Sequence, residues 1–231
     1  MIIHALKDCS LSLEGGSITV IVGRSGCGKT TLLKTIAGLE KADSGTVDFF
    51  GTIPKIGFMF QDPRLLPWLN VEQNLTLAFP PQRKIKNKKL EIKNEKLELK
   101  SRIKQVLEMT GLADRALSMP AELSGGMAQR AALARCLCRK PDILLLDEPL
   151  CSLDTFTRQF LRKELEKLFL DLNLTVILVT HDIEEAVFFG DRVLLMNNGT
   201  IENDVSIPLP RTRDCRAAEF QEFCRKIERG I

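Results

Sequence analysis

The chain has little of several residue types and patterns, and each shortage excludes a class of protein. Its 231 residues include no tyrosine, one tryptophan and two histidines. No apolar run approaches the roughly 20 residues that a membrane-spanning helix needs, and the first residues lack the regions of a secretion signal. The formal net charge of +3 is too small to indicate nucleic-acid binding. We therefore expect a cytoplasmic protein that binds no nucleic acid and meets a membrane only through a partner.

The seven cysteines are odd in number and show no paired metal-ligand spacing. Cys136 and Cys138 are separated by one residue in a segment of helical character, which suits neither a zinc site nor a redox pair. The cysteines therefore predict free thiols in a reducing compartment.

A glycine-rich loop follows the β-rich run 18–22. Residues 23–30 read Gly-Arg-Ser-Gly-Cys-Gly-Lys-Thr, which fits the phosphate-binding pattern G-x-x-x-x-G-K-S/T. Glycines let successive backbone N–H groups face one concavity, and the helix expected at 29–38 points its positive end there. Lys29 can reach the β- and γ-phosphates, and the Thr30 hydroxyl can ligate Mg²⁺. We expect the nucleotide site to comprise Gly23, Arg24, Ser25, Gly26, Cys27, Gly28, Lys29, Thr30 and Thr31.

Two adjacent acids end the apolar run 143–146. Neighbouring side chains in a strand point to opposite faces, so Asp147 and Glu148 can do different work. Asp147 is placed to hold Mg²⁺ through water, and Glu148 is placed to activate an attacking water as general base.

A second glycine pair opens the helix expected at 124–139. Ser124 is a good helix cap, and Gly125 and Gly126 expose backbone N–H groups at the positive end of that helix. A natural use of this second anion site is to close over a γ-phosphate held by another subunit. A capped helix after a flexible turn is the plainer alternative.

Strands alternate with helices along the chain, which predicts an α/β fold with a parallel core sheet. The opening segment 1–13 reads as an extended edge, and a hairpin is expected over 192–202 around the turn 197–199. We expect further strands at 44–50, 55–60 and 175–180, and further helices at 71–79, 155–172, 183–189 and after 216.

Residues 83–104 hold ten Lys or Arg and three Glu, a difference of +7. A solvated helix face is the expected role of such a run, and contact with membrane headgroups or an acidic partner is the alternative.

Taken in this order, the loop at 23–30, the segment 123–130 and the acids at 147–148 resemble the nucleotide-binding subunits of ABC transporters. The resemblance covers nearly the whole chain. It implies a single P-loop ATPase domain over 1–231, with an antiparallel β subdomain, a helical signature subdomain at about 65–140 and no C-terminal regulatory domain. It also implies a head-to-tail homodimer, or a paired ATPase subunit, around two ATP molecules. The signature residues facing the partner's ATP are then Leu123, Ser124, Gly125, Gly126 and Gln129.

The resemblance assigns three further residues. Gln61 would meet Mg²⁺ and the attacking water, so Thr30, Gln61 and Asp147 form the implied metal set. His181 follows the run 175–180 and would contact the γ-phosphate, joining Glu148 and Gln61 in catalysis. Asp154 would couple the two subunits rather than take part in the chemistry.

The stretch 60–68 is similar to the subfamily that powers import of nitrate, taurine and other sulfonates. Leu65 and Trp68 form an apolar patch that suits docking of a helix from a membrane-spanning permease subunit; a locally buried core segment is the alternative. The resemblance therefore implies a peripheral protein on the inner face of the cell membrane, linked to an extracytoplasmic solute-binding protein only indirectly.

The chain departs from that family where an aromatic residue upstream of the phosphate loop usually stacks on adenine, because only His4 is near. Two other functions stay open. One is a soluble ATPase of the same superfamily in metal-cluster assembly or nucleic-acid remodelling, and the other is a nucleotide-binding regulator without hydrolysis. The patch at 65–68 disfavours the first, and Glu148 disfavours the second.

Overall fold

The computed structural model describes residues 5–79, 89–151 and 153–230, and for residues 89–96 it describes the backbone alone. The chain divides into two compact units. The sheet unit comprises residues up to 61, 142–151 and 162 onwards, and the helical unit comprises 62–141 and 152–161.

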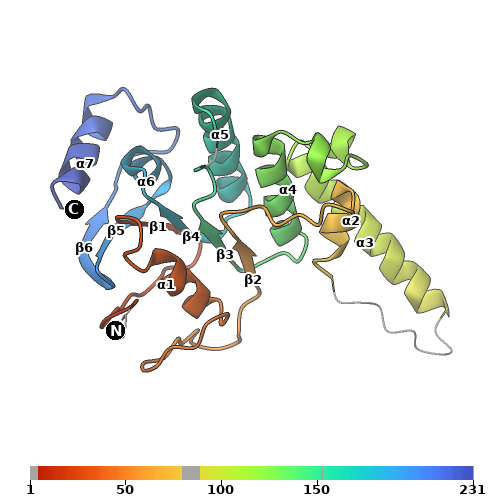
Figure 1. Ribbon diagram of the computed structural model, residues 1–231, viewed down its shortest axis with the longest axis horizontal. Helices are drawn as coiled ribbons and strands as arrows, with labels where there is room; N and C mark the ends of the chain where they lie inside the picture. The colour runs from red at the N-terminus through yellow and green to blue at the C-terminus, as the bar shows by residue number, and fades with distance from the viewer. Residues whose placement is uncertain (1–4, 80–88, 152, 231) are drawn as a thin grey trace. The chain divides into compact units, whose positions relative to one another are not determined.

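The sheet unit is built on six strands in the order β2-β3-β4-β1-β5-β6 (Figure 1). All neighbouring strands are parallel except β5 and β6, which form an antiparallel hairpin. The predicted α/β fold with a parallel core is therefore confirmed. The strands are β1 (Ile18–Val22), β2 (Ile56–Met59), β3 (Ile143–Asp147), β4 (Thr175–Thr180), β5 (Arg192–Asn197) and β6 (Thr200–Ser206).

The central strands are buried because helices pack on them. Helix α1 (Lys29–Ile36) contacts β3 and β4, and α6 (Ile183–Phe189) contacts β1 and β4. Helix α7 (Ala218–Glu228) packs on α6 in turn (Figure 1). Strand β1 is buried along its whole length, as expected for an apolar strand in the middle of a covered parallel sheet. The arrangement directs the carboxyl ends of the five parallel strands, β1 to β5, toward one edge, where loops can build a site.

A buried arginine ties the tail of the sheet unit to α6. The Arg213 guanidinium donates to the carbonyls of Val187 and Gly190 at the C-terminal end of α6, at 2.5 and 2.7 Å. It also donates to the carbonyls of Ile207 and Leu209. Burial lowers the pKa of Arg213 to about 10, and the surrounding carbonyls stabilise the charge that burial penalises. The connection between β6 and α7 is therefore fixed to the end of α6.

Two strands expected from the sequence do not form. Residues 44–50 and the described part of the opening segment, 5–13, have no strand assignment. Phe50 has a left-handed φ of 48° and its N–H bonds to the nearby Asp48 carboxylate, so the chain turns within the segment predicted as a strand. Phe50 and Ile53 are 92% and 85% exposed. A segment of strand-like sequence does not form a strand when no neighbouring backbone pairs with it.

The helical unit contains α2, α3, α4 and the beginning of α5. Helix α2 packs on α3 and α4, and α3 packs on α4. The Arg102 guanidinium of α3 donates to the Leu137 carbonyl at 2.7 Å, which satisfies a free carbonyl at the end of α4. The bounds are α2 (Val71–Thr76), α3 (Lys89–Met109), α4 (Gly125–Leu137) and α5 (Thr155–Asp171), with 3₁₀ turns at Ala113–Arg115 and Pro120–Glu122.

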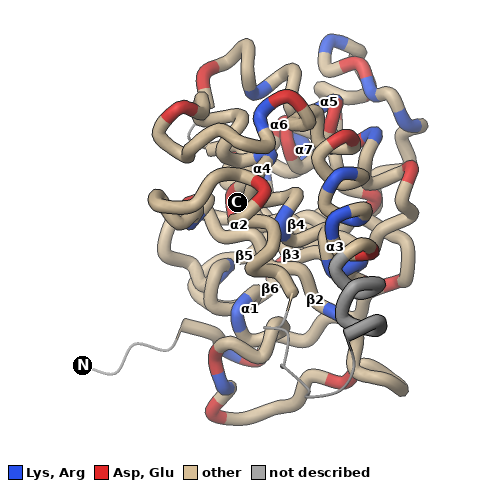
Figure 2. The backbone as a smooth tube through the Cα atoms, turned by 90° about the vertical axis from the view of Figure 1, so that its right-hand side faces the viewer, with Lys and Arg blue, Asp and Glu red and all other residues tan. Residues whose placement is uncertain are grey.

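The lysine-rich run lies only partly in the described chain. Residues 83–88 lie outside it, and the rest belongs to α3, where basic positions recur along the helix (Figure 2). Among the described side chains, Lys100 and Lys104 are exposed and Ile103 is buried. This end of α3 is amphipathic, with Ile103 on its packed face.

No helix in the described part of the chain is long and apolar enough to cross a membrane. All seven cysteines are free, as their irregular spacing predicts. The helical region expected at about 65–140 falls inside the helical unit, and the single ATPase domain over 1–231 stays a prediction.

Candidate nucleotide site

The loop between β1 and α1 has a backbone that only glycine allows. Gly28 has a φ of 107°, and a Cβ there would lie 2.2 Å from the Ala5 carbonyl oxygen. A Cβ on Gly23 would lie 2.1 Å from the Met196 carbonyl oxygen. Side chains are thus excluded from both ends of the loop, which lets its backbone curl tightly into the start of α1.

Lys29 lies inside the curve of this loop. Its side chain is nearly buried, and its Nζ donates to the carbonyls of Gly23 at 2.7 Å and Arg24 at 3.0 Å. Cys27 is buried in the core beneath, with Sγ 4.0 Å from Nζ. The ammonium group is therefore already positioned at the centre of the loop, where a phosphate could compete with the carbonyls for it.

Asp147, the last residue of β3, bonds to the first turn of the helix that follows this loop. The Thr30 Oγ1 donates to Asp147 Oδ1 at 3.0 Å. Burial raises the pKa of Asp147, the charge of Glu148 adds to that effect, and the Thr30 hydrogen bond and Lys29 oppose it. A hydroxyl and a carboxylate side by side form a hard oxygen pair of the kind Mg²⁺ prefers. The residues present therefore fit a magnesium ion.

The second acid, Glu148, lies just beyond the end of β3 and has other partners. Glu148 Oε2 lies 3.1 Å from His181 Nδ1 and 3.5 Å from Gln61 Nε2. Glu148 adopts a left-handed φ of 47°, and its N–H bonds to the Val179 carbonyl of β4. The structure thus brings together Glu148, His181 and Gln61, which the sequence places more than thirty residues apart.

The sequence reasoning missed two side chains near this cluster. Cys151 Sγ lies 3.5 Å from Gln61 Nε2, so the amide lies between the thiol and Glu148. Burial raises the pKa of the Cys151 thiol, and nearby Glu148 adds to the effect. Glu185 is buried in the first turn of α6. Cys151 follows Glu148 by three residues in one loop, and this closeness in sequence could have pointed to it.

The signature residues lie in the helical unit. Ser124 caps α4, its Oγ accepting from Met127 N at 3.3 Å. A Cβ on Gly126 would lie 2.6 Å from Thr157 Cγ2, so glycine permits the close approach of α5 to α4. Of the other signature positions, Gln129 is buried and Leu123 is half-buried.

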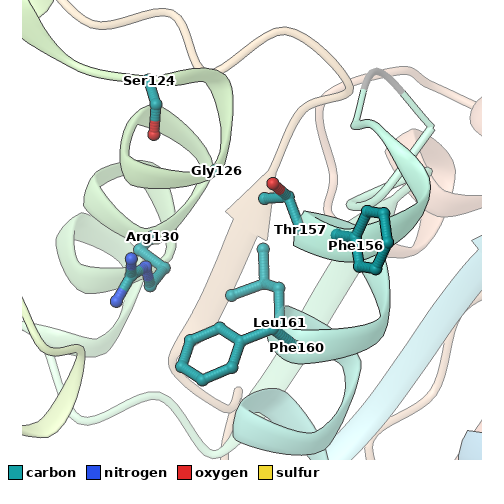
Figure 3. A pocket seen from close by; sticks show the side chains of 7 residues that line it. All are labelled: Ser124, Gly126, Arg130, Phe156, Thr157, Phe160 and Leu161. Carbon is teal, nitrogen blue, oxygen red and sulfur yellow. The ribbon is translucent and has the colours of Figure 1, made fainter.

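A pocket of about 330 Å³ opens beside these residues, within the helical unit. Figure 3 shows Thr157 and Leu161 directed from α5 toward α4, with Arg130 on the α4 side. Asp154 begins α5 by accepting from Phe156 N and Thr157 N, and the hydrogen bond with Thr157 lowers the pKa of Asp154. The pocket is lined by Ser124, Gly126, Arg130, Phe156, Thr157, Phe160 and Leu161.

The predicted docking patch is presented on a braced loop. The Trp68 side chain is 69% exposed, so the alternative of a buried core segment does not hold for it, and Leu65 is half-buried. The Arg135 guanidinium donates to the carbonyls of Arg64 and Pro63, at 2.8 and 2.9 Å. The buried Asn74 side chain bonds the backbone of Leu66. An exposed indole on a fixed loop is suited to contact a partner.

Comparison with known proteins decides the family. Residues 6–151 match the model of the family described as ABC transporter. The chain belongs to the ABC transporter family. It is 43% identical over 223 residues to the aliphatic sulfonates import ATP-binding protein SsuB 1 of Xanthomonas axonopodis pv. citri, covering 94% of this chain and 85% of that protein. It is 41% identical to SsuB of Pectobacterium atrosepticum, covering 98% and 81%.

Solved structures agree with this assignment. A dimeric ATP-binding cassette, MJ0796, in a post-hydrolysis state with ADP and Pi, is 32% identical with a TM-score of 0.74, covering 91% of this chain and 94% of that chain. The cbiO1 protein of Clostridium perfringens, part of the ABC transporter complex cbiONQ, is 27% identical with a TM-score of 0.76, covering 97% and 86%. The predicted ABC-type ATPase is thereby confirmed, while the roles of its individual residues stay predictions.

Proposed function

We propose that this ABC-type ATPase powers import of an aliphatic sulfonate, or a similar small organic anion, through separate permease subunits. The solute class is supported by relatives 40–44% identical over nearly the whole chain, whose names are all those of aliphatic sulfonates import ATP-binding proteins. The hydrolytic role is supported above all by one observation, the cluster of Glu148, His181 and Gln61 beside the Thr30–Asp147 pair.

ATP would bind with its phosphates against the N–H groups of the loop 23–30 and the start of α1, including Thr31. Lys29 would leave the carbonyls of Gly23 and Arg24 for the β- and γ-phosphate oxygens. Thr30, Asp147 and Gln61 would hold Mg²⁺, which supplies charge neutralisation on the phosphates when bound. This part of the site lies within the sheet unit.

Glu148 would orient the attacking water and accept its proton at Oε2. His181 would contact the γ-phosphate while its Nδ1 stays close to Glu148 Oε2. In this arrangement the imidazole limits where the carboxylate can turn, and the Gln61 amide limits it from another side. A base held within hydrogen-bond reach of its target is what proton transfer requires.

A second copy, or a paired ATPase subunit, would complete each site. Leu123, Ser124, Gly125, Gly126 and Gln129 of one subunit would approach the γ-phosphate held by the other. Asp154 begins α5 next to this surface and would carry the change between subunits. The similarity to dimeric cassettes favours this pairing.

Leu65 and Trp68 would dock on the permease subunit at the inner face of the membrane, and the extracytoplasmic solute-binding protein would be reached only through the permease. A soluble ATPase of metal-cluster assembly or nucleic-acid remodelling, and a regulator without hydrolysis, remain competitors. Neither would need a braced, exposed tryptophan together with an aligned base.

The test is uptake and hydrolysis with Glu148→Gln in vesicles carrying the permease and solute-binding protein. The parent should import an alkanesulfonate, and Glu148→Gln should lower turnover by at least about a hundredfold while ATP binding persists and a dimer accumulates. Glu164→Gln, an exposed change on α5, is the matched control and should behave as the parent. Hydrolysis by Glu148→Gln at the parent rate would remove Glu148 as the base, and uptake of nitrate alone would overturn the solute class.

A further inference from the structure

We propose that Thr180 and Glu185 are positioning residues that hold His181 against Glu148 through a buried hydrogen-bond relay. The inference rests on the proposed role of Glu148 and His181 in hydrolysis. Neither Thr180 nor Glu185 lies among the residues predicted to touch nucleotide, and both are almost completely buried, at 2% and 3% exposure.

The relay spans His181 on both sides. Thr180, the last residue of β4, donates its hydroxyl to Glu185 Oε2 at 2.8 Å. The same hydroxyl oxygen accepts from Asp182 N at 3.0 Å. Asp182 Oδ1 in turn accepts from Glu185 N at 3.1 Å. Three hydrogen bonds therefore close around the peptide segment that carries His181.

This arrangement differs from an ordinary capping box. In that motif the acid at the third helical position accepts directly from the N–H of the capping residue. Here Asp182 is the cap and Glu185 is the acid, but the Thr180 hydroxyl stands between them and bonds both. The end of β4 is thereby tied to the first turn of α6, a connection that a capping box alone would not make.

The position of His181 needs such a connection because its own side chain is poorly enclosed. The imidazole is 60% exposed, so packing restrains it little. Its approach to Glu148, at 3.1 Å, depends instead on where the backbone between β4 and α6 places its Cα. A carboxylate buried as completely as that of Glu185 is costly unless it is hydrogen-bonded. The Thr180 hydroxyl donates to this carboxylate and offsets part of that cost, and by accepting from Asp182 N it also fixes the turn.

Loss of this relay should lower the rate of hydrolysis, because it would let His181 move away from Glu148. A displacement of about 1 Å at a catalytic group can lower a rate by about a hundredfold. Thr180→Val keeps the shape of the side chain and removes the hydroxyl, so Glu185 and Asp182 N lose their shared partner. Thr180→Ser keeps the hydroxyl and removes only a methyl group. The two variants separate hydrogen bonding from packing at one buried position.

The experiment measures steady-state ATP hydrolysis of the full chain. We expect Thr180→Val to lower kcat by about ten- to a hundredfold with a small change in KM for ATP, and Thr180→Ser to stay near the parent. In a His181→Ala background, Thr180→Val should have no further effect, because the residue through which it acts is gone. If Thr180→Val does not fold, Thr180→Ala takes its place in the same cycle.

A second measurement reads His181 directly. The chain has only two histidines, so the ring ¹⁵N resonances of His181 can be assigned by comparison with His181→Ala, with His4 as internal reference. Thr180→Val should shift the His181 ring resonances and leave those of His4 in place, whereas Thr180→Ser should shift neither.

Three outcomes decide the matter. Parent-like kcat for Thr180→Val, or a loss that multiplies with His181→Ala, overturns the positioning role. Unchanged His181 resonances in a slow Thr180→Val variant overturn it as well, because they indicate a general loss of stability. Parent-like kcat for His181→Ala itself would instead contradict the proposed function.

Discussion

The sheet unit and the helical unit each carry part of the proposed site, and the two parts are built differently. In the sheet unit, Thr30, Asp147, Glu148, Gln61 and His181 come from four separate segments and lie within 3.5 Å of a neighbour in the set. In the helical unit the signature residues are nearly contiguous, Ser124 is exposed, and the pocket beside it is open to solvent. The first part is preorganised by the fold; the second presents donors that need another molecule to use them.

The sharpest test of this division mixes two variants, one with a defect in the sheet unit and one with a defect in the helical unit. Lys29→Ala removes the ammonium from the sheet unit, and Gly126→Val brings a side chain against Thr157 in the helical unit. Each variant alone should lose turnover by at least about a hundredfold. A mixture should regain about a quarter of the parent rate, because half of random dimers contain one intact composite site.

ATP binding to the separated subunits should fall in Lys29→Ala and persist in Gly126→Val. Gly15→Val is the control, since a Cβ at Gly15 meets nothing within 4 Å. A mixture as inactive as its components would show that one subunit supplies the whole site.

Trp68→Ala tests a surface of the helical unit that the chemistry does not use. We expect capture of the detergent-solubilised permease to weaken by about tenfold, as truncation of an exposed aromatic anchor does, with ATP binding unchanged. Leu117→Ala, at a 75% exposed apolar residue of the same unit, should leave capture unchanged. Equal losses of capture and ATP binding would indicate a general folding defect.

The smallest expected effect is one of stability, and it belongs to the sheet unit. Because burial raises the pKa of Asp147, the folded chain holds this proton more tightly than the unfolded chain does. The resulting stabilisation is present below the unfolded pKa and is lost as pH rises through the folded pKa. Asp147→Asn should therefore raise the Tm of the nucleotide-free, magnesium-free protein by a few degrees at pH 7.

The Tm difference between Asp147→Asn and the parent should shrink as the pH is lowered, because Asp147 of the parent then becomes protonated and neutral. The same variant should hydrolyse ATP more slowly in the presence of Mg²⁺. Differential scanning calorimetry across pH measures the first effect. A Tm that drops at pH 7 would mean that the Thr30 hydrogen bond and Lys29 outweigh burial at this carboxylate.

The parts of the fold that follow from local patterns could be predicted from the sequence. Helix α6 spans the predicted 183–189, and β4 spans the predicted 175–180. Strand alternation predicts different partners for Asp147 and Glu148, and the structure shows them, although Glu148 lies beyond the end of β3 with a left-handed φ. The family resemblance supplied Gln61 and His181, which no local pattern would have joined to Glu148.

The failures arise where the outcome depends on distant partners. The run 44–50 is predicted as a strand, but strand formation requires a neighbouring backbone, and a left-handed Phe50 turns the chain instead. The sequence around Trp68 could not show whether its side chain is buried or exposed, because burial depends on which distant residues pack around it. Cys151 was missed because its contact, Gln61, is distant in sequence. Glu185 was missed because its carboxylate bonds to the Thr180 hydroxyl, a partner that the usual capping motif does not include.

The buried Arg213 has a practical consequence for engineering. Its guanidinium holds one terminus of α6, while Thr180 and Asp182 secure the other. Shortening the polypeptide after residue 206 would remove the arginine and α7, and the carbonyls of Val187 and Gly190 would lose the guanidinium as a donor. Activity lost in such a shortened protein would reflect a loosened anchor for the histidine turn rather than a missing regulatory segment.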